Sequence, residues 1–337
     1  MNDRIATIIG EWTVRVGSEV GGGGLRDRRF VLVLSLRHGP PIGVSPRKCL
    51  HRLIGGLLGL VAATSPALAA PIKIVAAENF YGDITKQIGG PDVSVTSILS
   101  NPGQDPHLFE LSPSAARDVS TARIVIYNGI DYDPWMEKLL GAARSPDRKT
   151  IVVADLIGKK IGDNPHIWYD PVTVSALGKR LSDTLIAEDP ANKAGYEQRL
   201  ARFEESLKPI QGKIGELRQR FAGTPVTATE PIFGYMFDTL GMQVTNQTFQ
   251  LAVMNGTEPS ASDIASFEDS LKMHRVKLLI YNSQATDPIA DRMREIAKAA
   301  GIPLVAATET TPVGENYQSW MMNELDAVER ALAKQAP

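Results

Sequence analysis

Residues 190–221 read PANKAGYEQRLARFEESLKPIQGKIGELRQRF, and this stretch decides how the rest of the chain is organised. Its apolar residues recur at steps of three and four, and most positions between them are charged or Gln; the apolar set is Tyr196, Leu200, Phe203, Leu207, Ile210, Ile214 and Leu217. Such spacing predicts one amphipathic helix. At a rise of about 1.5 Å per residue it would be about 45 Å long, roughly the size of a domain. We therefore expect residues 190–222 to connect two lobes rigidly.

Short apolar runs alternate with helical patterns on both sides of this helix. Before it, the expected strands are IKIVAA (72–77), VSVTSI (93–98), IVIYN (124–128) and TIVVA (150–154), and the expected helices are 79–88, 113–121, 132–143 and 171–188. After it, the expected strands are PVTAT (225–229), VTNQTF (244–249), KLLIYN (277–282) and PLVAAT (303–308), and the expected helices are 231–240, 260–274, 288–300 and 315–334. This alternation predicts an α/β fold with two lobes, residues 71–189 and 223–337, each a mostly parallel sheet flanked by helices.

The segment 46–70 has the three parts of a secretory signal peptide. Arg47, Lys48 and Arg52 precede the apolar run LIGGLLGLVAA (53–63), which is too short to span a bilayer. The small-x-small triplet Ala67-Leu68-Ala69 follows. A short buried helix is the alternative, but the order of the three parts favours export and cleavage near Ala69/Ala70. We expect the mature protein to be soluble.

Residues 1–45 do not conform to a signal peptide, because they precede its basic region. They contain four consecutive glycines, Gly21–Gly24, and a basic run. Our hypothesis is that translation starts near Val44 and that this extension is an artefact of start-site choice; sequencing the precursor's N-terminus tests it, and a start at Met1 would contradict it. The sole cysteine, Cys49, precedes the apolar run, whereas a lipoprotein cysteine would follow it. The mature chain therefore has no thiol for a disulfide or a zinc site.

Composition and net charge narrow the classes of protein to which the chain can belong. The 337 residues are 43% hydrophobic and carry a formal net charge of −2, which fits a globular protein and gives no electrostatic footprint for nucleic acid. No GxSxG, HExxH, Walker A or GxGxxG pattern stands after residue 70. Chemistry must therefore be sought in other residues.

Two of the three histidines after residue 70 share a local context. His107 and His166 both follow a proline, in DPHLFE (105–110) and NPHIWYDP (164–171), and both come after an expected strand. Proline stiffens the loop, and ligands of open α/β sheets bind beyond the carboxyl ends of strands. A lone loop histidine is more often a surface residue, but two in matching contexts are candidate metal ligands.

Carboxylates occupy the same position in the second half. Glu230 ends the strand 225–229 and Glu309 ends the strand 303–308. Each could instead be an acidic residue at a helix N-terminus, where it favours the helix dipole. His274 follows Lys272 near a helix end, and Asp287-Pro288 most simply caps the next helix. From the residues alone, these alternatives stay open.

Four ordered segments resemble the metal-binding solute-binding proteins of ABC importers, the zinc- and manganese-uptake group that includes adhesin-like members. The segments begin DPHLFELSPSAARD (105–118), NPHIWYDP (164–171), TEPIFGYMFDTLGM (229–242) and ATETTPVGENYQSW (307–320), and the likeness covers residues 72–334. The resemblance implies four metal ligands: His107 and His166 from the first lobe, Glu230 and Glu309 from the second. It also implies capture of one divalent transition metal, zinc or manganese with iron as a further candidate, and delivery to an ABC permease in the inner membrane.

Some features depart from that family's pattern. Glu230 stands where many zinc importers have His, and Glu309 stands where Asp is common, so Glu309 is the least secure ligand and Asp287 is its alternative. The family's His-rich loop and lipidated cysteine are absent, which points to a soluble periplasmic protein, and we expect a monomer. Two His and two Glu ligands carry a charge of −2 that would neutralise a divalent ion, and zinc, manganese and iron all accept such ligands.

Two other functions compete with metal capture, and the first would use the same ligands. A secreted metalloenzyme, such as a hydrolase, would have three protein ligands and an open water position. An organic-solute-binding protein would need an aromatic-lined cleft. We expect metal capture and no enzymatic activity.

Overall fold

The computed structural model describes residues 70–101, 109 and 112–334. The N-terminal extension, the predicted signal peptide and His107 lie outside the described residues. Residues 66–337 form one compact unit. Among the described residues, no helix is both long enough and apolar enough to cross a bilayer.

The first sheet has the strand order β2-β1-β3-β4, and every neighbouring pair is parallel. Its strands are β1 (Ile72–Glu78), β2 (Val93–Leu99), β3 (Ile124–Tyr127) and β4 (Lys149–Val152). The second sheet repeats this arrangement in the order β6-β5-β7-β8. Its strands are β5 (Pro225–Ala228), β6 (Gln243–Val244), β7 (Leu279–Asn282) and β8 (Leu304–Ala307). The expected α/β fold with two parallel sheets is confirmed.

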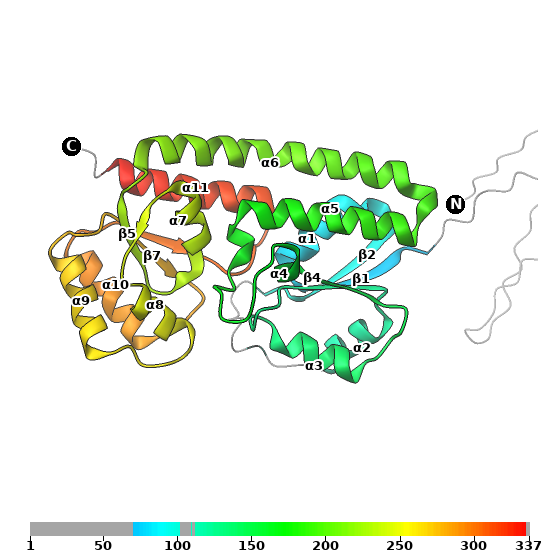
Figure 1. Cartoon of the computed structure of the whole chain (residues 1–337), viewed down its shortest axis with the longest axis horizontal. Helices are drawn as coiled ribbons and strands as arrows, with labels where there is room; N and C mark the ends of the chain where they lie inside the picture. Colours follow the sequence, from blue (N-terminus) through cyan, green and yellow to red (C-terminus); the bar gives the residue numbers. More distant parts are fainter. Residues whose placement is uncertain (1–69, 102–108, 110–111, 335–337) are drawn as a thin grey trace, which may run out of the picture. The chain divides into compact units, whose positions relative to one another are not determined.

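Helices connect the strands and cover the sheets (Figure 1). In the first half they are α1 (Asn79–Gly89), α2 (Pro113–Thr121), α3 (Pro134–Ala142), α4 (Val153–Leu156) and α5 (Pro171–Glu188). In the second half they are α7 (Gly234–Leu240), α8 (Gln247–Met254), α9 (Ala261–Lys272), α10 (Pro288–Ala299) and α11 (Tyr317–Ala333). Short 3₁₀ turns precede α5 at η3 (Ile167–Tyr169) and α7 at η5 (Pro231–Phe233).

Each sheet is buried on both faces, which explains why its strands are apolar runs. Successive residues of β1 point to opposite faces: Ile74 belongs to a core shared with α1, α5 and α6, whereas Val75 belongs to a core with α2 and α3. In the second sheet, Ile280 joins the same large core as Ile74, and Leu279 faces α9 and α10. One continuous core therefore underlies both sheets.

The long helix α6 (Lys193–Phe221) contacts both halves of the chain. It packs against α1 and α5 of the first half and against α7 and α11 of the second (Figure 1). Six of the seven apolar residues in the predicted stripe are buried; they are Tyr196, Phe203, Leu207, Ile210, Ile214 and Leu217. Full burial of one such side chain stabilises the fold by about 1.5–3 kcal/mol, so the stripe holds α6 against both sheets. The expected connector is confirmed.

The expected strand at 244–249 is wrong. Strand β6 ends at Val244, Asn246 takes a left-handed conformation with φ 60°, and α8 begins at Gln247. Phe249 is buried against Phe267 of α9, and Val253 packs against the same cluster. The apolar residues here are therefore spaced by four, as in a helix, and the β-branched and aromatic residues of VTNQTF gave a misleading strand pattern.

Candidate metal site

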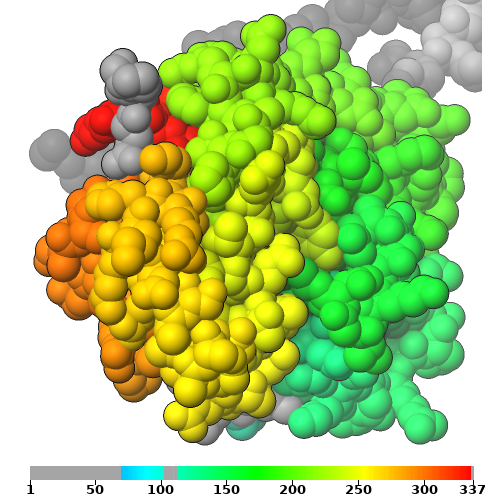
Figure 2. Space-filling model, turned by 60° about the vertical axis from the view of Figure 1, so that its left-hand side comes forward, coloured from blue at the N-terminus to red at the C-terminus, as the bar shows by residue number. Residues whose placement is uncertain are grey.

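Three of the four predicted ligands lie among the described residues, at the carboxyl ends of the two sheets. His166 lies between α4 and η3, Glu230 follows β5 and Glu309 follows β8. All three side chains are buried, with exposed fractions of 0% for His166, 3% for Glu230 and 0% for Glu309. Figure 2 shows the surfaces of the two halves, green for the first and yellow to orange for the second, meeting along a common boundary. Buried ionisable groups at such a junction call for a partner of opposite charge.

His166 and Glu309 come together from opposite halves of the chain. The distance from His166 Nε2 to Glu309 Oε1 is 3.8 Å. His166 Nδ1 lies 2.7 Å from Oδ1 of Asn164, which also accepts the His166 backbone N–H. Since Asn164 Oδ1 is the acceptor in both contacts, the ring proton belongs on Nδ1. Nε2 thus faces the glutamate, and in the neutral ring its lone pair would be directed there, which is the geometry of a metal-binding histidine oriented by a neighbouring acceptor.

Glu309 is oriented by donors from both halves. Tyr132 donates its hydroxyl to Oε2 over 2.8 Å, and Asn282 donates its side-chain amide to Oε1. Burial, and secondly the charge of Glu309, raise the pKa of Tyr132 well above its ordinary value, so the phenol keeps the proton it donates. Gln284 Oε1 accepts the backbone N–H of Glu309. The carboxylate is therefore fixed in direction before any ion binds.

Glu230 does not act as a helix cap. It occupies the N-cap position of η5, yet its side chain accepts no capping hydrogen bond there. The adjacent Pro231 carbonyl accepts a hydrogen bond of 2.7 Å from Asn164, the residue that orients His166. Tyr235 also donates to the Asn164 carbonyl. The segment that carries Glu230 is thus tied to the loop that carries His166.

The weaker candidates have ordinary structural roles. Asp287 is the N-cap of α10, and its Oδ1 accepts the backbone N–H groups of Ile289 and Ala290, each over 2.9 Å. His274 is exposed, with φ 52°, just after the end of α9. Both expectations for these residues agree with the structure.

The described residues supply only part of a metal site. Within residues 70–101, 109 and 112–334, no three His, Cys, Asp or Glu side chains form a group that could hold a metal ion by themselves. The structure brings His166 and Glu309 together and links the residue after Glu230 to the His166 loop. The ligand set of His107, His166, Glu230 and Glu309 stays a prediction.

Two buried carboxyl groups, Glu78 and Asp133, help to hold the loop that carries His166 in the first half of the chain. Asp133 accepts the backbone N–H groups of Asn128 and Gly129 at 2.6 and 2.8 Å. Asn128 in turn donates to the carbonyl of Pro165, beside His166. Burial raises the pKa of Asp133 to about 6, and burial together with the Asp133 charge raises the pKa of Glu78 well above its ordinary value. The raised pKa of Glu78 favours its protonated form beside Asp133, which reduces the repulsion between the two carboxyl groups.

A second buried carboxyl group, Glu324 of α11, holds the residue before Glu309. Its Oε1 accepts the Thr308 backbone N–H at 3.2 Å and the Trp320 indole N–H at 2.9 Å. Tyr169 donates its hydroxyl to the Thr308 carbonyl over 2.7 Å. Burial raises the pKa of Glu324 to about 8, so this group is largely protonated at neutral pH.

The raised pKa of Glu324 predicts that the protein becomes less stable as the pH rises. Between the ordinary carboxyl pKa of about 4.5 and the folded value of about 8, the folded chain retains a proton that the unfolded chain has lost, so stability falls as pH rises. Glu324→Gln mimics the protonated form. We expect the variant to match the wild type near pH 5 and to become more stable than it by roughly 1 kcal/mol per pH unit towards pH 8. Urea unfolding of the metal-depleted protein at several pH values measures this; a constant difference across the range would contradict it.

Sequence patterns missed the residues that orient the candidate ligands. Tyr132, Asn164 and Asn282 are neither acidic nor basic, so a search for ligand types passes over them. The one available signal was Asn164, which stands two residues before His166 in NPHIWYDP. Tyr132 and Asn282 are distant from Glu309 in sequence, and only the fold brings them together.

Comparison with known proteins places the chain among metal-uptake components. The model of the family described as zinc-uptake complex component A periplasmic (ZnuA) matches residues 74–331. The metal ABC transporter substrate-binding lipoprotein FimA of Streptococcus parasanguinis is 26% identical over 306 residues, 84% of this chain and 96% of that protein. The manganese ABC transporter substrate-binding lipoprotein PsaA of Streptococcus anginosus is 25% identical over 287 residues, 78% of this chain and 90% of that protein. The iron ABC transporter substrate-binding lipoprotein MtsA of Streptococcus pyogenes serotype M1 is 26% identical over 294 residues, 80% and 92% of the two chains.

A solved structure shares the fold. The periplasmic zinc binding protein TroA from Treponema pallidum superposes with a TM-score of 0.66 at 19% identity, over 78% of this chain and 99% of that one. The two parallel sheets with a long helix between them are therefore the architecture of this group of proteins.

Proposed function

The chain belongs to the family of periplasmic zinc-uptake components A, and from this premise we propose that it captures a divalent transition-metal ion and delivers it to the membrane permease of an ABC importer. The ion is its cargo and not a catalytic cofactor. The observation that carries the proposal is the meeting of His166 and Glu309, which come from opposite halves of the chain with Nε2 and Oε1 3.8 Å apart.

Membership of the family separates this function from the enzymatic alternative. The family comprises substrate-binding components of importers and not enzymes, so a secreted metallohydrolase is not supported. The surroundings of the two residues agree with capture, because both are fully buried and each is oriented by hydrogen bonds from its neighbours. Four protein ligands would leave no position open for a reacting water, so the proposed site would favour binding over turnover.

The proposed ligand set is His107, His166, Glu230 and Glu309. The hydrogen bonds of Asp287 favour Glu309 as the fourth ligand, because the Asp287 carboxylate already accepts two backbone N–H groups of α10. Two neutral imidazoles and two carboxylates would carry a charge of −2, which compensates the charge of a divalent ion in a buried site. Such compensation is what makes burial of the two carboxylates affordable.

The cargo we propose is one ion of zinc, manganese or iron. Relatives are named for manganese and iron, and the structural neighbour for zinc. Nitrogen and oxygen ligands bind all three metals, whereas geometry and supply decide among them. Tetrahedral coordination by the four side chains would suit zinc, and bidentate carboxylates would raise the coordination number and suit manganese.

The cellular setting follows the same proposal. We propose that residues 46–70 are a signal peptide cleaved near Ala69/Ala70 and that the mature chain acts in the periplasm as a monomer. Its lobes would then be residues 71–189 and 223–337, joined by the helix 190–222. Several relatives are named lipoproteins, whereas Cys49 of this chain precedes the apolar run of the signal peptide. The partner would be the permease of an inner-membrane importer.

Metal titration tests the function directly. We expect the chain that begins at Pro71 to bind one equivalent of zinc, manganese or iron. Binding should be tight near neutral pH, and the metal should be released as the pH is lowered through the reference histidine pKa of about 6.5, because protons then compete for the imidazoles. Competition against a chromophoric chelator measures affinity and stoichiometry for each metal. Two tight equivalents, or an affinity that does not change between pH 7 and about 5, would contradict the proposed site.

A further inference from the structure

One face of α1 is bound to the segment that follows Glu309. Asn79, Asp83 and Gln87 are spaced by four residues, so they form a stripe along this helix. Their partners lie in the other half of the chain: Asn79 binds Thr311, Asp83 accepts the backbone N–H of Tyr317 at 2.9 Å, and Gln87 pairs with Gln318. The stripe therefore ties the first half to residues 311–318 of the second.

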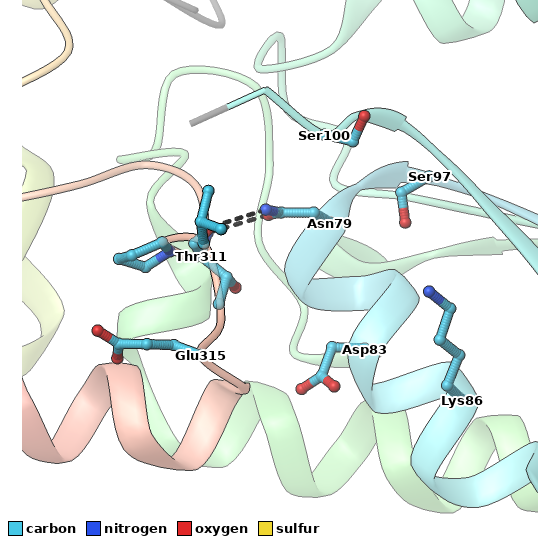
Figure 3. Close-up of a pocket in the computed structure, with 9 residues that line it drawn as sticks. Asn79, Asp83, Lys86, Ser97, Ser100, Thr311 and Glu315 are labelled. Carbon is cyan, nitrogen blue, oxygen red and sulfur yellow. Dashed lines mark hydrogen bonds between the residues drawn. The ribbon is translucent and has the colours of Figure 1, made fainter. Parts of the chain in front are cut away.

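The contact nearest to Glu309 has two hydrogen bonds. The Asn79 side chain donates to the Thr311 carbonyl over 2.8 Å and accepts the Thr311 N–H over 3.0 Å. Figure 3 shows both bonds, side by side, between α1 and the loop that leads to α11. Two bonds to the backbone of one residue fix its orientation as well as its position, much as the rungs of a sheet do. Thr311 is two residues after Glu309, so fixing the Thr311 backbone also restricts the position of Glu309.

Other contacts between the halves are sealed from water. Tyr317 donates its hydroxyl to the Trp168 carbonyl over 2.8 Å within the core. Around it, Trp168, Tyr169 and Trp320 pack ring against ring. Breaking such contacts would leave buried polar groups unsatisfied, which is unfavourable. These buried contacts are therefore expected to keep the two halves together permanently.

The Asn79 contact differs because it borders a pocket. A pocket of about 400 Å³ lies beside it, lined by polar residues that include Asp83, Lys86, Ser97 and Glu315 (Figure 3). Water in this pocket can replace each of the two hydrogen bonds when they break, so the opening cost is smaller than in the core. The contact can therefore open while the aromatic joint remains intact.

Residues from both halves hold the segment around Glu309. Gln284, from the same half as Glu309, accepts the N–H groups of Glu309 and Thr310 at 2.5 and 3.2 Å. Asn79, from the opposite half, holds Thr311. Loss of the Asn79 contact would free the backbone just after Glu309 from the half that carries His166, while the hydroxyl groups of Tyr132 and Tyr169 would still bind Glu309 and Thr308. The distance between the two proposed ligands would then be held by fewer contacts.

We propose that Asn79 is a positioning residue for Glu309: it acts as a releasable clasp that holds the Glu309 segment at binding distance from His166, and its opening limits the rate of metal release. This inference rests on the proposed function, because it assumes that Glu309 is a metal ligand. The clasp makes the site rigid before metal arrives, and local opening at the pocket, without wide separation of the halves, lets the ion leave.

Metal release from two Asn79 variants tests the clasp. Asn79→Leu keeps nearly the same side-chain size but removes both hydrogen bonds, and Asn79→Ala removes the side chain. The matched control is Gln87→Ala on the same helix face, eight residues further along. It removes a reciprocal amide pair with Gln318 (3.0 and 2.8 Å) and a hydrogen bond from Gln87 to Asp83 over 2.8 Å. The measurements are the dissociation rate of Zn²⁺ into a chelator, the visible spectrum of the Co²⁺-loaded protein, and the free energy of unfolding without metal.

We expect both Asn79 variants to release Zn²⁺ about tenfold faster, because both hydrogen bonds to Thr311 are lost, and to change the Co²⁺ spectrum. Gln87→Ala should change the release rate by less than about twofold and leave the spectrum unaltered, although its stability falls by a similar amount. Equal behaviour of Asn79→Leu and Gln87→Ala would overturn the clasp. A wild-type protein that binds neither Zn²⁺ nor Co²⁺ would instead overturn the proposed function, and the clasp with it.

Discussion

His166→Ala is expected to weaken metal binding by more than about 100-fold, beyond the 10–100-fold range that the loss of a supporting hydrogen bond around a metal typically causes. The reason is that the variant removes the Nε2 lone pair directed at Glu309, 3.8 Å away in the structure. It also leaves His107 as the one proposed ligand from the first half. Competition titration with a chelator measures the loss, and circular dichroism of the metal-depleted protein shows whether the fold is retained.

Asn164→Ala is the graded control for this experiment. Asn164 binds the His166 ring and the Pro231 carbonyl but lies one contact away from the proposed ion. Its loss should weaken binding by about 10–100-fold, because the imidazole keeps its lone pair but loses the acceptor that fixes its tautomer and direction. If His166→Ala binds metal as tightly as Asn164→Ala, His166 is not a direct ligand.

Glu309→Ala is expected to produce a loss of similar size, more than about 100-fold, whereas Asp287→Ala should leave metal affinity unchanged. Sequence comparison alone makes Glu309 the least secure ligand. The structure argues otherwise, because the carboxylate is fully buried and is held by Tyr132 and Asn282. Asp287→Ala should lose only the cap of α10 and about 1 kcal/mol of stability.

The thermal shift caused by metal gives a rapid comparison of the two variants. A ligand that binds only the folded state raises its stability by mass action, so the shift should persist in Asp287→Ala and disappear in Glu309→Ala at the same metal concentration. Glu309→Gln separates charge from shape: it keeps an oxygen acceptor for Tyr132 but removes the negative charge, and it should also bind weakly. The reverse ranking of Glu309 and Asp287 would move the fourth ligand to the β7–α10 loop.

The regular part of the fold could be predicted because its apolar periodicities are strong and local. The stripe from Tyr196 to Leu217 predicted α6, and the buried runs around Ile74 and Ile280 predicted strands that are covered on both faces. The prediction failed at 244–249, where the chain turns through Asn246 in a left-handed conformation and the side chain of Phe249 packs as part of a helix. A six-residue segment rich in β-branched and aromatic residues does not distinguish these two outcomes.

Of the candidate site, the sequence predicts only the residues whose type is that of a metal ligand. Two Pro-His pairs and two strand-end glutamates marked ligand positions, and family resemblance supplied their combination. The groups that orient them depend on contacts across more than a hundred residues, such as Tyr132 with Glu309 and Asn79 with Thr311. No sequence pattern around a neutral Tyr or Asn indicates which distant residue it will bind. These contacts can therefore be identified only in the folded structure.

The central claim is that one ion is held between the two halves by His166 and Glu309. A crystal structure of the metal-loaded chain, with anomalous difference maps collected on both sides of the absorption edge of the bound metal, tests it most directly. For zinc, we expect one peak at about 2.0–2.2 Å from both His166 Nε2 and a carboxylate oxygen of Glu309. A peak coordinated by Asp287 or His274 in place of these two residues, or no peak at the junction of the two halves, would contradict the account.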